Sequence, residues 1–305
     1  MVLKPKNKKT SQEGNNTQEQ LIQWLFETGA VKVCDEGRPF WYTSGTIGPY
    51  YINTHYLYGG EEKAGYLLDV IDNALRMKRE DITDILLKEE LKNMRESAVY
   101  SKLAEMLALK ASEIIPGGEG AAAISGGERR DWFFSVITAH ILDIPHISIF
   151  KDGTPVVYYH GKTVQAKAAG IDTMRILHIA DLVTEASSYI KTWLPSIAKH
   201  GGSIKRTLVV VDRLQGGREA LECEDVELFS MVRINREFFR KAAELGAIPE
   251  SSLDFIMSYI DDPHGSMAGF LKNNPDFLKS SLGGDERTAG RARLCLENRI
   301  YGDLF

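Results

Sequence analysis

The sequence lacks several features that define whole classes of protein. Its three cysteines, Cys34, Cys223 and Cys295, are odd in number and far apart, with no metal-type spacing and no obvious disulfide framework. This usage fits a reducing cytoplasm. No window of about 18 uninterrupted apolar residues occurs, so we expect no membrane span. The formal net charge of −5 gives no global reason to expect nucleic acid as a partner.

Several motifs that indicate a particular chemistry are also absent. The chain contains neither the phosphate-binding pattern GxxxxGK[ST] nor a dinucleotide-binding fingerprint. No HExxH motif and no Cys/His cluster argues for a transition metal, and no GxSxG motif suggests a serine hydrolase. Any chemistry must therefore come from residues that the fold brings together.

The chain begins with a polar, basic segment. Residues 1–17, MVLKPKNKKTSQEGNNT, lack the apolar core of a signal peptide, and we expect them to form a disordered tail. With 43% hydrophobic residues overall, the chain has enough apolar side chains for one large domain with appendages.

Short apolar runs alternate with helical patterns in the middle of the chain. The pattern predicts strands at 121–125, 145–150, 176–180 and 208–211, and helices at 132–142 and 185–199. Such alternation favours right-handed crossovers, so we expect an α/β fold with a mainly parallel sheet flanked by helices. Residues 31–60 predict short strands, residues 80–115 predict helix, and the chain after Asp225 is expected to be helical to about Leu245.

A first candidate site is the loop 125–131, SGGERRD, between a predicted strand and a predicted helix. Its two glycines would let the backbone approach a ligand closely. Arg129 and Arg130 at a helix start suit a diphosphate, because their fork-like donors add to the helix dipole. The alternative is a solvated turn in which Asp131 caps the helix and the arginines have no ligand.

A second candidate site follows the predicted strand 176–180. There Asp181, Thr184 and Ser187 precede a helix at the carboxyl end of a strand, which is where open α/β sheets bind their ligands. The unpaired N–H groups and the positive dipole end of that helix suit an anion. The alternative is an ordinary strand-to-helix turn with Thr184 or Ser187 as the N-cap.

Two further loops carry charged side chains. The polar segment 151–171 predicts a binding loop or hairpin in which His160 and Lys162 could supply protons or charge; the alternative is that His160 is simply exposed. Arg213, which follows an apolar run, could reach a carboxylate bidentately. The alternative there is a local Asp212–Arg213 surface pair, which would contribute little.

Two stretches resemble a known enzyme family. Residues 40–53, FWYTSGTIGPYYIN, align without gaps to a pattern of Phe, three residues, Ser-Gly, two residues, Ser-Pro, two or three aromatics and Asn or Asp. Residues 209–221, VVVDRLQGGREAL, are close to VVVDRxxGGxxxL. On these residues the chain resembles an orotate phosphoribosyltransferase of the type I phosphoribosyltransferase group, and the resemblance covers about residues 20–247.

The resemblance implies a domain organisation and a reaction. A phosphoribosyltransferase-like domain would span 18–247, with a hood at 18–60 and a helical insert at 80–115, followed by a helical extension at 248–305. Such an enzyme would transfer a phosphoribosyl group from phosphoribosyl diphosphate (PRPP) to orotate, giving orotidine 5′-monophosphate and diphosphate. The resemblance also implies a homodimer and Mg²⁺, which would arrive with PRPP and for which Asp181 is a candidate contact.

The family's functional positions carry over residue by residue. Thr184 and Arg213 would contact orotate, and Tyr51 and Ile52 would pack on its ring. Together with the charged loop residues above, the expected catalytic residues are Asp181, Lys151 and His160, and the expected PRPP contacts are Gly126, Gly127, Arg129, Arg130, Asp181, Ser187, Ser188 and Lys162.

The chain departs from the family in its PRPP loop, which has two acids followed by V-x-T-x-G-x-S. Ala180 replaces the first acid, and Glu185-Ala186 replaces Thr-Gly, so a negative charge lies where a 5′-phosphate would rest. Repulsion at about 4 Å would cost on the order of 1–4 kcal/mol. We hypothesise that Arg129 and Arg130 supply the missing positive charge.

Three functions are therefore consistent with the sequence. The first is an orotate phosphoribosyltransferase. The second is a catalytically degenerate protein of the same fold that binds or senses a pyrimidine or a nucleotide. The third is an enzyme for another base or donor, in which Glu185 contacts a hydroxyl instead of a phosphate.

Overall fold

A computed structural model describes residues 9–35 and 38–302 of the chain. The chain divides into two compact units: Met1–Ala30 with Thr54–Ile234, and Val31–Asn53 with Asn235–Phe305. The short strands expected to form a hood belong to the same unit as the C-terminal helices.

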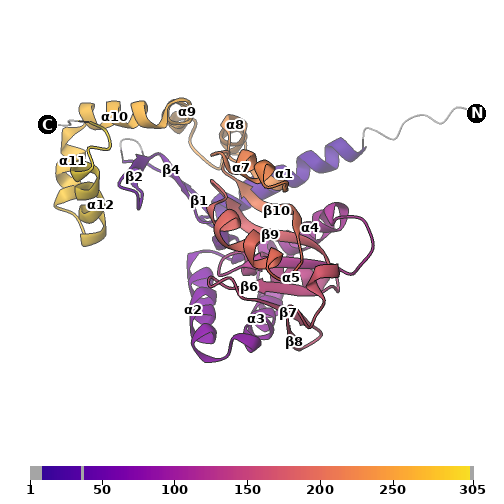
Figure 1. The fold of residues 1–305 in the computed structure, drawn as a ribbon. Helices are drawn as coiled ribbons and strands as arrows, with labels where there is room; N and C mark the ends of the chain where they lie inside the picture. The colour runs from indigo at the N-terminus through magenta and orange to yellow at the C-terminus, as the bar shows by residue number, and fades with distance from the viewer. Residues whose placement is uncertain (1–8, 36–37, 303–305) are drawn as a thin grey trace, which may run out of the picture. The chain divides into compact units, whose positions relative to one another are not determined.

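The first unit is built on a seven-stranded sheet with the order β11-β10-β9-β5-β6-β7-β8. Its strands are β5 (Ala122–Gly127), β6 (His146–Ile149), β7 (Pro155–Tyr159), β8 (Lys162–Gln165), β9 (Arg175–Val183), β10 (Ile204–Asp212) and β11 (Glu227–Arg233). The pairs β6–β5, β5–β9, β9–β10 and β10–β11 are parallel, and β7 and β8 form an antiparallel hairpin at one edge. The predicted α/β class with a mainly parallel sheet is therefore confirmed (Figure 1).

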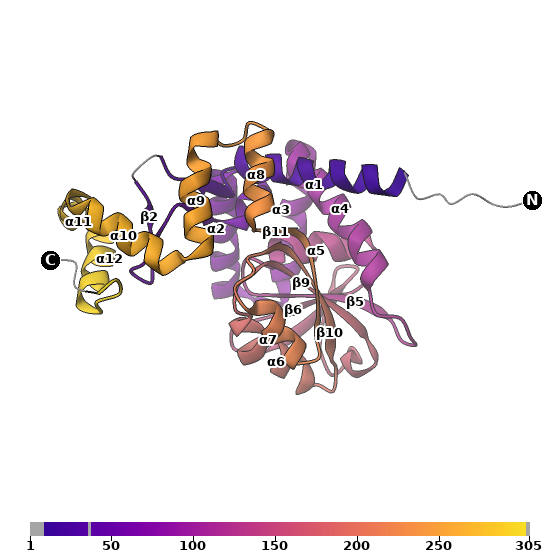
Figure 2. The same ribbon diagram turned by 90° about the horizontal axis from the view of Figure 1, so that it is seen from above.

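Helices cover both faces of this sheet. The described α-helices of this unit are α1 (Lys9–Glu27), α2 (Glu61–Met77), α3 (Ile82–Glu96), α4 (Ala98–Ile114), α5 (Trp132–Ile141), α6 (Leu194–Ala198) and α7 (Gly217–Cys223). The helix α5 packs on β5, β6 and β9, and α3 and α4 pack on α5. The opposite face buries an apolar cluster that includes Ala180, Tyr189, Trp193, Ile197 and Leu221, which places α6 and α7 on that side (Figure 2).

Two parts of the first unit differ from the sequence-based expectation. Residues 9–17 of the expected tail are helical, because α1 extends upstream of the buried stripe of Leu21, Ile22 and Leu25, whereas residues 1–8 lie outside the described part of the chain. The segment after Asp225 is not helical at first but forms β11, parallel to β10. The helical structure expected at 80–115 is confirmed as α3 and α4.

The second unit combines two small sheets with five helices among its described residues. The strands β1 (Val31–Val33) and β4 (Tyr50–Ile52) pair antiparallel, as do β2 (Phe40–Trp41) and β3 (Ile47–Gly48). The helices are α8 (Arg236–Glu244), α9 (Leu253–Asp261), α10 (Pro263–Asn273), α11 (Pro275–Leu282) and α12 (Glu286–Glu297).

Specific contacts hold these strands to the C-terminal helices. The ring of Tyr50 lies 4.7 Å from that of Phe239 on α8. The indole nitrogen of Trp41 donates to Ser281 Oγ at 2.9 Å, and Arg291 donates to the Trp41 carbonyl at 2.6 Å. The strands of the second unit therefore depend on helices that follow them by about 200 residues.

The topology of the first unit predicts where a ligand should bind. From β5 the chain crosses through α5 to β6 on one side, and from β9 it crosses to β10 and β11 on the other side. The neighbouring strands β5 and β9 therefore flank the point where the strand order reverses. In open α/β sheets, ligands bind outside the carboxyl ends of the strands at this switch point. None of the helices in the described chain is long and apolar enough to cross a membrane.

Candidate active site

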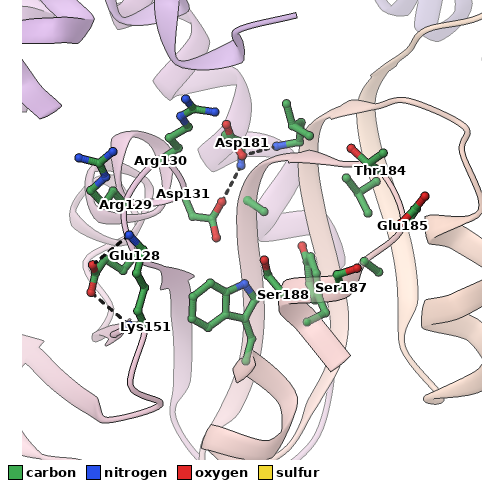
Figure 3. A pocket seen from close by; sticks show the side chains of 16 residues that line it. Glu128, Arg129, Arg130, Asp131, Lys151, Asp181, Thr184, Glu185, Ser187 and Ser188 are labelled. Carbon is green, nitrogen blue, oxygen red and sulfur yellow. Dashed lines mark hydrogen bonds and ion pairs between the residues drawn. The ribbon is translucent and has the colours of Figure 1, made fainter. Parts of the chain in front are cut away.

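A cavity of about 430 Å³ opens at the carboxyl ends of β5 and β9. Residues from the loop after β5, from the segment after β6 and from the loop after β9 line it (Figure 3). Its lining residues are Glu128, Arg129, Arg130, Asp131, Lys151, Trp193 and the segment 180–189. The predicted sites Asp181, Thr184, Ser187 and Ser188 thus come together with Arg129, Arg130 and Lys151 at the switch point of the sheet.

The strand β5 ends with Gly126 and Gly127. Glycine suits both positions because a Cβ at either one would collide with a neighbouring side chain. A Cβ on Gly126 would lie 2.1 Å from Ser135 Oγ, and one on Gly127 would lie 2.3 Å from the Trp193 ring. The Glu128–Arg129 peptide bond that follows is cis. Neither glycine lines the cavity, so a role in diphosphate binding stays a prediction.

The three cations of the cavity differ in how they are held. Arg129 Nη1 lies 2.6 Å from Asp72 Oδ1 on α2, and Lys151 Nζ lies 3.7 Å from Glu128 Oε1. Arg130 is exposed and forms no ion pair within the described residues. Because two of the positive charges already have carboxylate partners, Arg130 is the cation that is most available to an anion.

Asp131 does not cap α5, in contrast to the alternative considered from the sequence. Its Oδ2 accepts the Gly127 N–H at 3.0 Å, and its Oδ1 accepts the Asp181 N–H at 3.1 Å. Asp131 therefore joins the carboxyl ends of β5 and β9. In Asp181, Oδ1 accepts the Leu182 N–H at 2.7 Å, whereas Oδ2 is buried without a hydrogen-bond partner in the described chain.

The neighbouring carboxylates change the charge of the cavity. Burial, reinforced by the negative charge of Asp131, raises the pKa of Asp181 to about 8, and Arg130 opposes this shift. The carboxyl group of Asp181 therefore keeps its proton to a higher pH than an ordinary aspartate does. The buried His178 lies behind them, with Nε2 3.7 Å from Asp131 Oδ2 and Nδ1 2.9 Å from Ser125 Oγ.

The loop after β9 forms the other wall of the cavity. Thr184, Glu185, Ser187 and Ser188 are at the cavity, and helical geometry begins at residue 187. Ala186 has φ 56°, a left-handed conformation that favours glycine. The loop therefore keeps a backbone shape suited to glycine although its residue is alanine. A π-helical turn, Tyr189–Trp193, continues into α6 and brings Trp193 to the cavity.

Arg213 lies next to this loop but does not line the cavity. Its N–H donates to the Val183 carbonyl at 3.0 Å, which places it beside Thr184. The expected surface alternative, an Asp212–Arg213 pair, is wrong, because Asp212 accepts a hydrogen bond from Arg218 at 3.2 Å. The predicted orotate contacts Tyr51 and Ile52 belong to the other unit and stay predictions.

His160 and Lys162 are not brought to the cavity. The strand β7 runs antiparallel to β6 and pairs Tyr158 with His146, so the turn after β7 lies at the amino end of β6. There His160 Nε2 lies 3.4 Å from Asp143 Oδ1 and borders a separate cavity of about 200 Å³. The expectation that these two residues serve the PRPP site is therefore not met within one chain, because the hairpin reverses the chain direction.

Sequence reasoning missed Asp131, His178 and Trp193 as parts of this site. Asp131 was read only as a helix cap, and its contact with Asp181 depends on the adjacency of β5 and β9. His178 lies inside an apolar strand, and Trp193 lies nine residues beyond Thr184. The tertiary fold alone reveals their positions.

Comparisons with known proteins point in the same direction as the geometry. No protein-family profile matches the chain. It is 27% identical over 101 residues to an orotate phosphoribosyltransferase of Sulfolobus acidocaldarius, covering 33% of this chain and 50% of that protein. It is 35% identical over 60 residues to an orotate phosphoribosyltransferase of Methanocaldococcus jannaschii, covering 20% of this chain and 34% of that protein.

A solved structure supports the fold. The Leishmania donovani UMP synthase matches 80% of this chain and 42% of its own with a TM-score of 0.50 and 13% sequence identity. In sequence, the chain is similar to parts of these orotate phosphoribosyltransferases. It has the α/β fold of the type I phosphoribosyltransferases, with a central, mostly parallel sheet flanked by helices. The chain spans half or less of the length of the curated relatives that it matches.

Proposed function

We propose that this orotate phosphoribosyltransferase-like chain binds PRPP and orotate and transfers the phosphoribosyl group to the base. The observation that carries the proposal is the buried, unpartnered Oδ2 of Asp181, which lies between a cationic wall and a hydroxyl-lined loop (Figure 3). A buried carboxyl oxygen without a partner is costly, so a ligand hydroxyl at that position would stabilise the site.

Each part of PRPP has a complementary group in the cavity. The diphosphate would face Arg130 and Lys151, the ribose hydroxyls would reach Asp181, and the 5′-phosphate would meet the loop at Ser187 and Ser188. As the C1–diphosphate bond breaks, orotate N1 would bond to C1. The residues of the chain would mainly position the reactants and stabilise charge.

The described residues contain no group of three or more His, Cys, Asp or Glu side chains that could hold a metal ion by themselves. We therefore assign Mg²⁺ to the phosphate oxygens of PRPP, because Mg²⁺ commonly binds through substrate phosphates and few carboxylates. When bound, Mg²⁺ would neutralise the charge that develops on the diphosphate. Asp181 would be a carboxyl contact for it from the chain.

Orotate would bind on the side of Thr184 and Arg213. The hydrogen bond from the Arg213 N–H to Val183 holds the end of β10 against the start of this loop. The planar guanidinium of Arg213 suits the carboxylate of orotate, because it can donate two parallel hydrogen bonds. Ring contacts from Tyr51 and Ile52, a homodimer and a cytoplasmic location complete the proposal as predictions.

A second function, ligand binding without turnover, is favoured by one group of residues. Ala180 removes an acid, and Glu185 adds a negative charge to the loop proposed for the 5′-phosphate. Glu185 is exposed, so solvent screens its repulsion of a phosphate. This screening is why we place the transferase first.

Isothermal titration calorimetry with orotate, and with PRPP plus Mg²⁺, tests both functions, followed by an assay of diphosphate release. The transferase predicts binding of both ligands and orotate-dependent release of diphosphate. Binding of both without release would support the second function. If PRPP does not bind, the transferase proposal is wrong, and if neither ligand binds, both proposals are wrong.

A further inference from the structure

The carboxylate of Asp131 is buried and directed away from its own helix. The residue occupies the N-terminal end of α5 without a side-chain capping hydrogen bond, and it is only 8% exposed. Its two oxygens instead accept the N–H groups of Gly127 and Asp181. A carboxylate oxygen can accept two hydrogen bonds. Asp131 also lies close enough to the carboxyl group of Asp181 to raise its pKa, so the two carboxyl groups are neighbours.

Asp131 lies on the same side of the site as the methyl group of Ala180. A Cβ on Gly127 would lie 2.8 Å from Asp131 Oδ2 and 2.3 Å from the Trp193 ring, so carboxylate and ring share one face of the end of β5. Ala180 belongs to the apolar cluster that contains Trp193. The carboxylate of Asp131 therefore approaches the space that a longer side chain at position 180 would enter.

We infer that Asp131 is the second carboxylate of a sugar-binding pair, which with Asp181 receives the adjacent hydroxyl groups of a ribose. The inference rests on the proposed function, because it takes PRPP as the ligand. Asp181 contributes its buried and unpartnered Oδ2. Asp131 contributes its carboxylate from the start of α5, after β5, whereas Asp181 lies in β9, so the pair spans the switch point of the sheet.

This pairing gives a physical reason for alanine at position 180. An acidic side chain there would add a third carboxylate beside Asp131 and Asp181, where Arg130 is the cation that favours the ionised form. Like charges at short range repel strongly in a partly buried site. The chain thus carries one acid at the start of α5 and the other in β9, rather than both next to each other in sequence.

The competing interpretation is that Asp131 only fastens the ends of β5 and β9 together. The choice of ligand separates the two roles. Inorganic diphosphate has no sugar, so its affinity should not change when a hydroxyl-binding group is lost. The affinities of ribose 5-phosphate and PRPP should fall. If Asp131 has a purely structural role, its substitution should weaken the binding of all three ligands alike, because they share the loops that Asp131 joins.

The test compares wild type with Asp131→Asn, Ala180→Asp and the double variant by calorimetry. The ligands are PRPP with Mg²⁺, ribose 5-phosphate, and inorganic diphosphate with Mg²⁺. The control is Asp143→Asn, which lies before β6 at the amino end of that strand, away from the cavity. Asp131→Asn should weaken the binding of PRPP and ribose 5-phosphate by about tenfold or more, and the binding of diphosphate by less than about twofold. Ala180→Asp should weaken PRPP in wild type but regain affinity in the Asp131→Asn background.

Each other outcome overturns the inference. If Asp131→Asn weakens diphosphate as much as PRPP, Asp131 is a structural connection only. If wild type binds PRPP and Asp131→Asn binds it equally well, the inference fails while the proposed function stands. If wild type binds none of the ligands, both fail. Should Asp131→Asn not fold by thermal unfolding, Ala180→Asp alone still decides, because a gain in PRPP affinity contradicts the inference.

Discussion

The two walls of the cavity offer an anion different kinds of group. The wall from β5 and β6 carries Arg129, Arg130 and Lys151, whereas the wall after β9 carries hydroxyls, backbone N–H groups and the carboxylate of Glu185 (Figure 3). All the positive charge of the cavity thus lies on one wall. The difference indicates a ligand with its strongest negative charge at one end, because cations bind a diphosphate more tightly than neutral donors do.

Removing the unpaired arginine should have the largest effect on this polarity. Arg130→Ala is expected to weaken diphosphate binding by about 10- to 100-fold, since a hydrogen bond to a charged group contributes about 1.5–3 kcal/mol. Arg129→Ala is expected to have a smaller effect, because Asp72 already holds that guanidinium. Calorimetry with inorganic diphosphate measures both. An equal or larger loss in Arg129→Ala would show that the two arginines act in the opposite order.

The pH dependence of folding stability should reveal the raised pKa of Asp181, which lies between the two walls. The pKa of Asp181 is raised to about 8 by folding, so the folded state holds a proton that the unfolded chain has released above about pH 4. This carboxyl therefore lowers stability as pH rises from about 4 to 8. Asp181→Asn should raise the melting temperature by at least about 2 °C more at pH 8.5 than at pH 5. An equal change at both pH values would contradict the shifted pKa.

Removing the negative charge of the second wall should make the two walls more alike. Glu185→Gln is expected to strengthen PRPP binding by about twofold to tenfold at low salt, since repulsion across water at about 4 Å is on the order of 1 kcal/mol. The gain should shrink at 0.5 M salt, because Glu185 is exposed. Glu219→Gln on α7 is the matched control. Unchanged affinity at low salt would show that no phosphate lies near Glu185.

Releasing the paired arginine should strengthen the cationic wall slightly. Asp72→Asn leaves Arg129 without its partner and is expected to raise diphosphate affinity by about twofold to fivefold, the range of a partly exposed ion pair. Asp69→Asn, on the same helix α2, is the control. The gain should vanish in the Arg129→Ala background. A gain that persists there would mean that Asp72 acts on the site by another route.

The smallest expected effect concerns the backbone of the second wall. Ala186→Gly removes the cost of a left-handed alanine, about 1 kcal/mol, but adds flexibility to the unfolded chain that costs about 0.4–1 kcal/mol. We expect a change in the free energy of unfolding between zero and about 1 kcal/mol of stabilisation. Ala198→Gly, at the end of α6, should instead destabilise. Chemical denaturation measures both, and a clear loss in Ala186→Gly would contradict the expected strain.

The sequence predicts local features of this protein better than it predicts contacts between distant segments. The run 176–180 and the residues after it predict the strand β9 and its polar end correctly, because period and turn chemistry are local signals. The strand β11 was mistaken for helix, since Leu228 and Val232 show little alternation without their partner β10. The same limit hid Asp131, whose role depends on a neighbouring strand.

The site prediction failed where the chain reverses direction. His160 and Lys162 lie close in sequence to Lys151, yet the strand β7, which runs antiparallel to β6, carries them to the amino end of β6, away from the cavity. Sequence spacing indicates which residues share a loop but not the edge at which that loop ends. The grouping of Val31–Asn53 with the C-terminal helices is not predicted for a similar reason. The local sequence of those strands does not indicate which distant segments they pack against.

That grouping has a consequence for the protein while it is being made. The strands of Val31–Asn53 leave the ribosome about 180 residues before Asn235, where the helices of the same unit begin. At about 5–20 residues per second, translation of the intervening segment takes on the order of 10–40 s. During that interval Trp41 and Tyr50 have none of their final partners from the C-terminal helices. The sheet of the first unit can form first, and the nascent chain meanwhile exposes aromatic strands to chaperones.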